Sequence, residues 1–477
     1  MLSPLAAGFS SGVESAASSS SASGALTRLL PPPDGQCYFG FTFRLHDATD
    51  PAVGDTRPFH ERIQDSITNE LRGKTPTFLT VWADWQASDQ PGQPLVPFST
   101  WDTDIATARN VTGPDSLLYL DWTLTNPGAD RADYNGITTK DIAAGVADDY
   151  IRQYAAAIKD YAGPVLIRLF GGEFNGSWWY SQSPFANHNL AATDFVNAWR
   201  RVVDIFRQTG ALNASFAWIP NAVPAANRPG WIDPNIGAYY PGDDYVDWGG
   251  ADMYDFEPVS DLNSVYDFAV AHGKPFFLAE WGVRHSASAL SPTEQRDWIE
   301  SMFGFFTAHD DVKAINYFNY NNRSGGPVDP TRTVYLDGGE VNYQANTNDN
   351  DSRLLADSGA GFRSTYANGI SQSRFTSSVL TQTINVQKPA TATATIVSVT
   401  VRGQTATMRW AGTGGAATFD LAVRRIPGSW TLVRARYTGH TYTLRGKHNQ
   451  RFAIRVRGRN RSGTSGPWST PRTLTLR

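Results

Sequence analysis

Short apolar runs alternate with stretches of helical periodicity between about residues 35 and 370. Apolar runs of this length are typical of strands buried on both faces, and the periodic stretches are typical of helices that cover them. The eight predicted strands are residues 37–43, 77–85, 117–124, 165–170, 215–220, 246–254, 276–281 and 314–320. The clearest predicted helices are residues 60–72, 139–161, 193–209, 261–272 and 293–309.

Eight strands, most of them followed by a helical stretch, predict an α/β fold of the (β/α)8 TIM barrel type. The alternative is an open, doubly wound sheet. No glycine-rich dinucleotide turn follows the first strand, and the strand count reaches eight, so the barrel is favoured.

A different pattern follows this region. Residues 371–390 are rich in Ser, Thr and Gln and are predicted to be a linker. Beyond them, seven short runs with strand periodicity and turn residues between them predict an all-β sandwich over residues 391–477. The seven runs are residues 395–401, 406–410, 419–425, 431–437, 441–444, 452–459 and 473–476.

The first residues are assigned separately. Residues 1–24 are rich in Ser and Ala, and the first basic residue is Arg28, so the usual basic start of an export signal is missing. We expect residues 1–34 to be a disordered leader or a truncated signal, and the protein to be secreted or held at a bacterial cell surface.

The charge is divided unevenly along the chain. Residues 388–477 contain sixteen Lys and Arg and one acid, Asp420, which gives about +15, whereas the part before them has 25 basic and 44 acidic residues and about −19. Such a basic module is either a solvated spacer or a tether to an acidic cell-wall or extracellular polymer. The chain's low charged fraction (18%) and 12% aromatic content favour a globular protein with aromatic-lined clefts over a nucleic-acid-binding one.

Few residues here are suited to metals or redox chemistry. Cys37 is the single cysteine, and the eight histidines are scattered without the spacing of metal ligands. No apolar stretch has the length of a membrane span. We therefore expect no cofactor, no metal and no membrane span, and a monomer.

Two predicted strands lead to a glutamate with glycine and tryptophan nearby. Glu173 follows the fourth strand and Glu280 ends the seventh. Parallel barrel strands place their carboxyl ends at one face, where catalytic groups gather. A pair of carboxyl groups about 5–5.5 Å apart is the arrangement of a retaining glycoside hydrolase. We predict that Glu173 is the general acid/base and Glu280 the nucleophile.

Aromatic and amide residues near the same strand ends fit sugar binding, because aromatic faces stack on pyranose rings and amides bond hydroxyl groups. The predicted substrate-binding residues are Trp178, Trp281, Tyr254, Asn175, Trp85, Asn221 and Arg168.

Residues 35–370 resemble glycoside hydrolase family 26, the β-mannanase family of the retaining barrel clan. The resemblance rests on residues 142–145, 149–151, 164–168, 173–178, 218–221, 239–248, 252–254 and 279–282, in that order. It implies Glu173 as acid/base, Glu280 as nucleophile and Tyr254 as the partner that keeps the nucleophile ionised. It also implies an endo-acting enzyme on β-1,4-mannan, with β-1,3-xylanase and mixed-linkage β-glucanase as alternatives.

The sequence departs from the family pattern beside the acid/base. The family commonly has a histidine directly before that glutamate, where this chain has Gly172, and Arg168 lies five residues before Glu173 instead of four. An extra glycine of this kind could form a bulge that re-aims the glutamate. The departure also leaves open a barrel that binds carbohydrate without turnover.

The C-terminal module resembles a fibronectin type III domain. The resemblance rests on Trp410, Leu444 and residues 451–460, with Phe452 at the position where tyrosine is usual.

Overall fold

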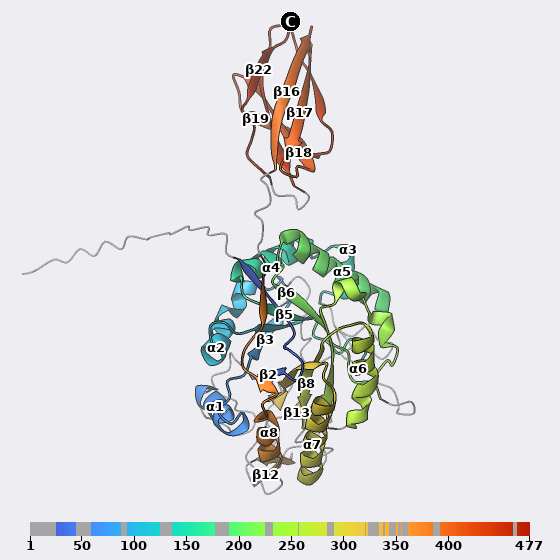
Figure 1. Ribbon diagram of the computed structural model, residues 1–477. Coiled ribbons are helices and arrows are strands. Elements are labelled where there is room, and N and C mark those ends of the chain that lie inside the picture. The colour runs from blue at the N-terminus through green and yellow to red at the C-terminus, as the bar shows by residue number, and fades with distance from the viewer. Residues whose placement is uncertain are drawn as a thin grey trace, which may run out of the picture.

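The computed structural model describes residues 25–43, 59–86, 93–124, 136–176, 190–224, 232–255, 257–283, 291–319, 321–322, 333–336, 339–342, 350–351, 354, 361–384, 392–460 and 465–477. Within them the chain forms an α/β barrel followed by an all-β unit (Figure 1).

Eight parallel strands form the barrel, in the order in which they occur along the chain, and the pairing of the first with the last closes it. This arrangement confirms the predicted (β/α)8 fold. The barrel strands are β2 (Cys37–Phe41), β3 (Phe78–Asp84), β4 (Leu118–Thr123), β5 (Val165–Leu169), β6 (Ala214–Trp218), β7 (Trp248–Tyr254), β8 (Phe276–Gly282) and β9 (Val312–Tyr317).

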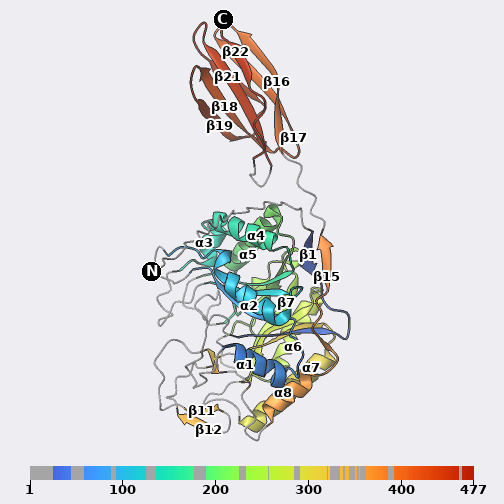
Figure 2. The same ribbon diagram turned by 90° about the vertical axis from the view of Figure 1, so that its left-hand side faces the viewer.

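Helices surround these strands (Figures 1 and 2). The α-helices are α1 (Phe59–Asp65), α2 (Asp102–Thr112), α3 (Thr139–Ala144), α4 (Asp148–Tyr161), α5 (Ala192–Thr209), α6 (Leu262–Ala271), α7 (Pro292–Ala308) and α8 (Phe362–Ile370). A π-helical segment, Ser66–Glu70, continues α1, and short 3₁₀ turns occupy Phe98–Trp101, Ile236–Tyr239, Asp243–Tyr245 and Val259–Asp261. The helix predicted over residues 139–161 is two helices, because Gly145 adopts a left-handed conformation (φ +90°) that ends α3.

The apolar core has two layers. Cys37, Phe39 and Phe41 point outward from β2 into the large cluster between the strands and the helices. Tyr38 points inward and belongs to a smaller cluster inside the barrel, which also contains Phe78. Position 40 lies on the same inner face, and only glycine fits there, because a Cβ atom would lie 2.1 Å from the Phe78 ring. The packed interior leaves the carboxyl ends of the strands as the place for polar chemistry.

Short strands outside the barrel modify the boundaries expected from the sequence. Strand β1 (Leu26–Leu29) pairs antiparallel with β15 (Thr381–Ile384), and β14 (Phe375–Thr376) pairs parallel with β2. Parts of the expected leader and of the expected linker are therefore built into the barrel unit. Two further small ladders join β10 (Asn321–Asn322) to β13 (Asn350–Asp351), and β11 (Thr333–Leu336) to β12 (Gly339–Asn342).

Residues 393–475 form two antiparallel sheets, as the alternating pattern predicts. One sheet contains β16 (Thr393–Arg402), β17 (Thr405–Thr413) and β20 (Thr441–Arg445). The other has the order β19 (Trp430–Tyr437), β18 (Thr418–Ile426), β21 (Arg451–Arg459) and β22 (Arg472–Thr475). Side chains from both sheets, including Trp410 and Phe419, form one core. The β-sandwich is confirmed, and its identity as a fibronectin type III module stays a prediction.

No helix in the described part of the chain is both long and apolar enough to cross a bilayer.

Asp420 is fully buried in the basic sandwich, on β18. Its carboxylate accepts hydrogen bonds from Arg457 (2.8 Å) and Arg459 (2.9 Å) of β21 and from the backbone N–H of Arg436. Burial acts to raise the pKa of Asp420, but the hydrogen bonds from Arg459, the Arg436 amide and Arg457 outweigh it and lower the pKa to about 2.

We expect Asp420→Asn to lower the free energy of unfolding of the sandwich by about 2–3 kcal/mol at neutral pH, since one pKa unit corresponds to about 1.4 kcal/mol. A lowered pKa stabilises the fold above the unfolded value of 3.8 and ceases to do so as the pH falls through about 2. Calorimetry of the full chain should therefore show the difference from wild type shrinking in acid. The exposed Asp115→Asn serves as the control, and a difference that is independent of pH would contradict this account.

Candidate active site

Glu173 leaves β5 through an unusual turn. Residues 170–173 all have positive φ, with values of +62°, +79°, +67° and +47°. Four left-handed residues in a row turn the chain sharply, and the Glu173 N–H then donates to the Ile219 carbonyl at the end of β6 (2.8 Å). The extra residue noted in the sequence is thus absorbed by a left-handed turn at the end of β5.

Both the backbone conformation and the adjacent Arg168 side chain require glycine at position 172. A Cβ at this position would lie 2.4 Å from Nε of Arg168. No larger side chain, a histidine included, fits here unless Arg168 moves. The glycine and the position of Arg168 therefore belong together.

Glu280 reaches the barrel interior because β8 is irregular. Phe277 and Ala279 lie in the inner cluster, whereas Leu278 and Trp281 lie in the outer one. The register with β7 skips Ala279, which places Glu280 opposite Asp252. The irregularity directs Glu280 inward and Trp281 outward, although strict alternation from Ala279 would do the reverse.

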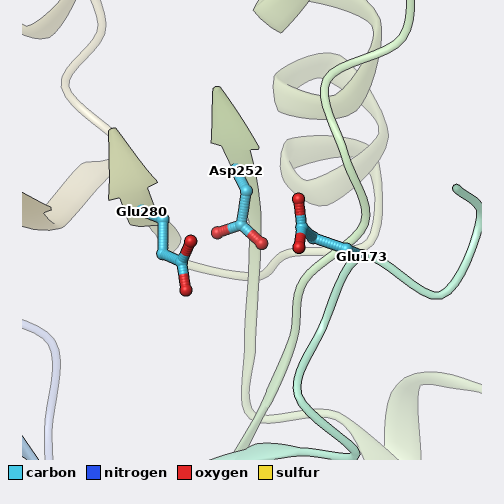
Figure 3. Close-up of side chains that lie close together, drawn as sticks. All are labelled: Glu173, Asp252 and Glu280. Atoms are coloured by element: carbon cyan, nitrogen blue, oxygen red, sulfur yellow. The ribbon is translucent and has the colours of Figure 1, made fainter. Parts of the chain in front are cut away.

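Three carboxylates meet at the mouth of the barrel. Figure 3 shows Asp252 between Glu173 and Glu280, with the three side chains pointing toward one another. One oxygen from each lies within 4.8 Å of the others. Glu173 is 8%, Asp252 1% and Glu280 9% exposed. The predicted pair is therefore close together, near the separation of about 5–5.5 Å that retaining hydrolysis uses.

Arg168 on β5 neutralises part of the negative charge of these carboxylates. Its guanidinium is buried and forms ion pairs with Asp121 on β4 (2.6 Å), with Asp252 and with Glu280. One cation thus faces three carboxylates that it contacts directly, with Glu173 close by. Arg168, predicted as a substrate-binding residue, lies beneath the site and holds its acids.

Asp252 is a third member of the site, and the sequence patterns did not predict it. Burial raises its pKa well above the ordinary value; Arg168 opposes this, and the charges of Glu280 and Glu173 add to the rise. Its Oδ1 atom has no hydrogen-bond partner among the described residues. A signal was available, because Asp252 lies two residues before Tyr254 on one strand and so shares its inward face.

Tyr254 donates a hydrogen bond from its hydroxyl to Oε2 of Glu280 (2.8 Å). Burial raises the pKa of Glu280, and the Arg168 charge and the Tyr254 hydrogen bond act to lower it. The contact that the family resemblance implies is present, and it favours the ionised form of Glu280.

Asn175 and Asn221 are buried and tie the Glu173 turn to the end of β6. The Asn175 side-chain oxygen accepts from the Asn221 backbone N–H (2.8 Å), and the Asn221 amide donates to the Glu173 carbonyl (3.2 Å). Asn175 also donates to the Asp233 carbonyl (3.2 Å). These bonds give both side chains a positioning role, and their contact with the substrate stays a prediction.

Two tryptophans expected at the mouth lie elsewhere. Trp281 is 0% exposed and packs against Phe306 of α7 and Tyr317 of β9. Trp85 is also fully buried and stacks on Trp122, with ring centroids 4.4 Å apart. Both belong to the layer between strands and helices, so neither can stack on a sugar. Trp178 lies outside the described residues.

Trp82 is the described tryptophan that fits a sugar contact. It is half-buried and packs against Phe318 in the small cluster that contains Tyr254. Thr80 and Phe78 on the same strand point inward, so a period of two along β3 predicts that Trp82 also faces the interior.

The three clustered carboxylates offer oxygen atoms of the kind that hard cations prefer. Arg168 already supplies positive charge to two of them. This charge pattern favours an acid–base site over a metal centre.

Residues 130–319 match the model of glycosyl hydrolase family 26. The chain is 27% identical over 240 residues to Endoglucanase H of Acetivibrio thermocellus, 28% over 181 residues to Beta-1,3-xylanase TXYA of a Vibrio species, and 30% over 112 residues to Mannan endo-1,4-beta-mannosidase A and B of Caldalkalibacillus mannanilyticus. These matches cover 47%, 32% and 23% of this chain, but only 24%, 37% and 20% of the relatives. Residues 130–319, which form part of the barrel, are therefore similar to glycosyl hydrolase family 26, and the matched part is a minority of each relative.

Tyr254→Phe should move the acid limb of the pH–activity profile to higher pH and lower the turnover number. The Tyr254 hydrogen bond lowers the pKa of Glu280, so its loss raises the pH at which this carboxyl group ionises. The measurement is kcat/KM against pH on a soluble substrate. An unchanged acid limb would show that the Tyr254 contact does not control the ionisation that limits activity.

Asn175→Ala should reduce kcat by about tenfold while KM changes little, because it loosens the turn that holds Glu173 without removing a sugar contact. Steady-state kinetics with wild type as reference tests this. If KM rose and kcat were unchanged, Asn175 would be a substrate-binding residue after all.

Proposed function

We propose that this protein is a retaining endo-β-glycosidase that cleaves internal bonds of β-1,4-mannan. The observation that carries the proposal is the carboxylate pair: Glu173 and Glu280 have oxygens within 4.8 Å of each other, and both are nearly buried. A pair this close leaves little room for the water of an inverting reaction and suits direct attack by one carboxylate.

In the proposed reaction, Glu280 attacks the anomeric carbon while Glu173 gives its proton to the departing glycosidic oxygen. A glycosyl ester on Glu280 results. Glu173, now ionised, takes a proton from water, which attacks the anomeric carbon and releases Glu280. Tyr254 and Arg168 hold the two oxygens of Glu280 and so orient the nucleophile.

The choice of β-1,4-mannan follows from the family resemblance and from the mannosidase among the relatives. The xylanase and endoglucanase relatives make β-1,3-xylan and mixed-linkage β-glucan the polymers to compare. Because such polymers lie outside cells, we propose that the protein acts as a secreted or surface-bound enzyme.

The first test is reducing-sugar release from β-mannan, galactomannan, β-1,3-xylan and mixed-linkage β-glucan by wild type and by Glu280→Ala. We expect hydrolysis of the mannans and a loss of about 10³-fold or more in the variant. The exposed Glu300→Ala should behave as wild type. Hydrolysis of another polymer instead would show that β-mannan is not the substrate. No hydrolysis of any of the four polymers, together with binding to one of them, would favour a non-catalytic carbohydrate-binding protein.

The role of Glu173 as general acid is tested with a substrate whose leaving group needs no protonation. Glu173→Ala should lose about 10²–10⁴-fold on polysaccharide, but far less on an aryl mannoside whose leaving group departs without a proton. Added azide should restore turnover and yield a glycosyl azide of retained β configuration. An azide product of inverted configuration would contradict the retaining mechanism.

A further inference from the structure

The outer face of the four-stranded sheet in the C-terminal sandwich carries a ladder of alternating arginine and tryptophan side chains. The Arg424 Cζ atom lies 5.0 Å from the centroid of Trp430, and that of Arg455 lies 4.3 Å from Trp430 and 4.4 Å from Trp468. Arg457 completes the ladder, 4.7 Å from Trp468. We call these five residues the arginine ladder.

The strand register explains why these residues gather. Ala422 of β18 pairs with Arg455, and Ala453 of β21 pairs with Arg424. Small alanines beside the arginines leave room for the indole rings to lie between the long side chains. Phe419, Leu421 and Val423 alternate with the outward residues and fill the core. The ladder is thus a regular product of the sheet.

The charge of this face is not balanced within the module. Asp420, its single acid, is already shared by Arg457 and Arg459. Among the described residues, no carboxylate pairs with Arg424 or Arg455, and the Nε atoms of both are buried without hydrogen-bond partners. Stacking on indole covers the flat faces of a guanidinium, so the Nη groups at its outer end are the donors that remain for an anion.

A surface cavity of about 380 Å³ adjoins the end of the ladder. Trp468 lines it together with Arg472, Ser469 and Thr470 and with Thr393 and Thr395 of β16. An indole wall, hydroxyl groups and a cation are the groups that recognise an acidic sugar.

We propose that the arginine ladder and this cavity bind a carboxylated polysaccharide, with uronate groups held by the Nη groups of Arg424 and Arg455 and a sugar ring in the cavity beside Trp468. The choice of a carboxylated sugar polymer over other polyanions rests on the cavity, whose aromatic and hydroxyl lining suits a pyranose ring. The site is separate from the barrel, and it does not depend on the proposed catalytic reaction.

The test is affinity electrophoresis and calorimetry of the full-length protein with polygalacturonate, with neutral dextran as the reference polymer. Arg424→Gln combined with Arg455→Gln should weaken binding about tenfold or more, because two charge-assisted contacts are lost. Arg402→Gln combined with Arg409→Gln removes the same charge from exposed positions on the other sheet and should change binding less than about twofold. Equal losses in both pairs would overturn the assigned surface.

Arg455→Lys tests whether binding requires the planar guanidinium group, because lysine keeps the charge but lacks that group. This variant should still weaken binding, and full retention would overturn the contact through the Nη groups. Trp468→Phe tests the cavity with little change in shape and should weaken binding to polygalacturonate; unchanged binding would remove the cavity from the site. Thermal unfolding of each variant identifies any that fail to fold.

Double-stranded DNA and the barrel variant complete the test. DNA that bound as tightly as polygalacturonate at about 0.15 M salt would make this a general polyanion surface and overturn the proposal. Glu280→Ala should bind polygalacturonate as wild type does, because its substitution lies in the barrel. A loss of binding in that variant would place the polymer at the barrel mouth instead of on the ladder.

Discussion

The ion pairs of Arg168 are the interaction on which the candidate site depends. Asp121, Asp252 and Glu280 come from three different strands, and each contacts the same buried guanidinium. Without this cation, three carboxylates would share a dry interior, and loss of one partner from such a cluster costs about 3–5 kcal/mol. Arg168 therefore fixes the relative positions of β4, β5, β7 and β8 at the mouth. Its charge also opposes the rise in pKa that burial causes at Glu280.

The same constraint explains the departure from the family pattern. Arg168 lies against Gly172, where a Cβ would come within 2.4 Å of its Nε atom. The chain must then return Glu173 to the mouth through a run of left-handed residues, which for a residue other than glycine costs about 1–2 kcal/mol. The backbone bonds from Glu173 to Ile219 and from Gly176 to Glu173 hold this strained turn in place. One arginine thus determines the glycine and, through it, the path of the loop that carries Glu173.

The fold was largely readable from the sequence, and the site only in part. Buried parallel strands are continuous apolar runs, so all eight were located, and Glu173 and Glu280 followed from where two of them end. Trp281 and Trp85 were misplaced because a residue's position near a strand end does not say which face it takes. Trp281 depends on an irregular register between β7 and β8, which no local pattern reveals. Strand β15 was taken for linker because its pairing with β1 uses backbone atoms and leaves its Thr and Gln side chains partly exposed.

Asp252 shows why composition alone understates a site of this kind. Taken in sequence, it is one acid in an apolar strand, and its importance arises only from the distance to Glu173 and Glu280. The raised pKa of Asp252 favours its protonated form, and a protonated carboxyl group can lie beside an ionised Glu280 at low electrostatic cost. Ionisation of Asp252 would add a negative charge beside Glu280 and raise the energy of the ionised form of Glu280. Arg168 contacts both Asp252 and Glu280, so this one cation opposes the rise in the pKa of both carboxyl groups at the mouth.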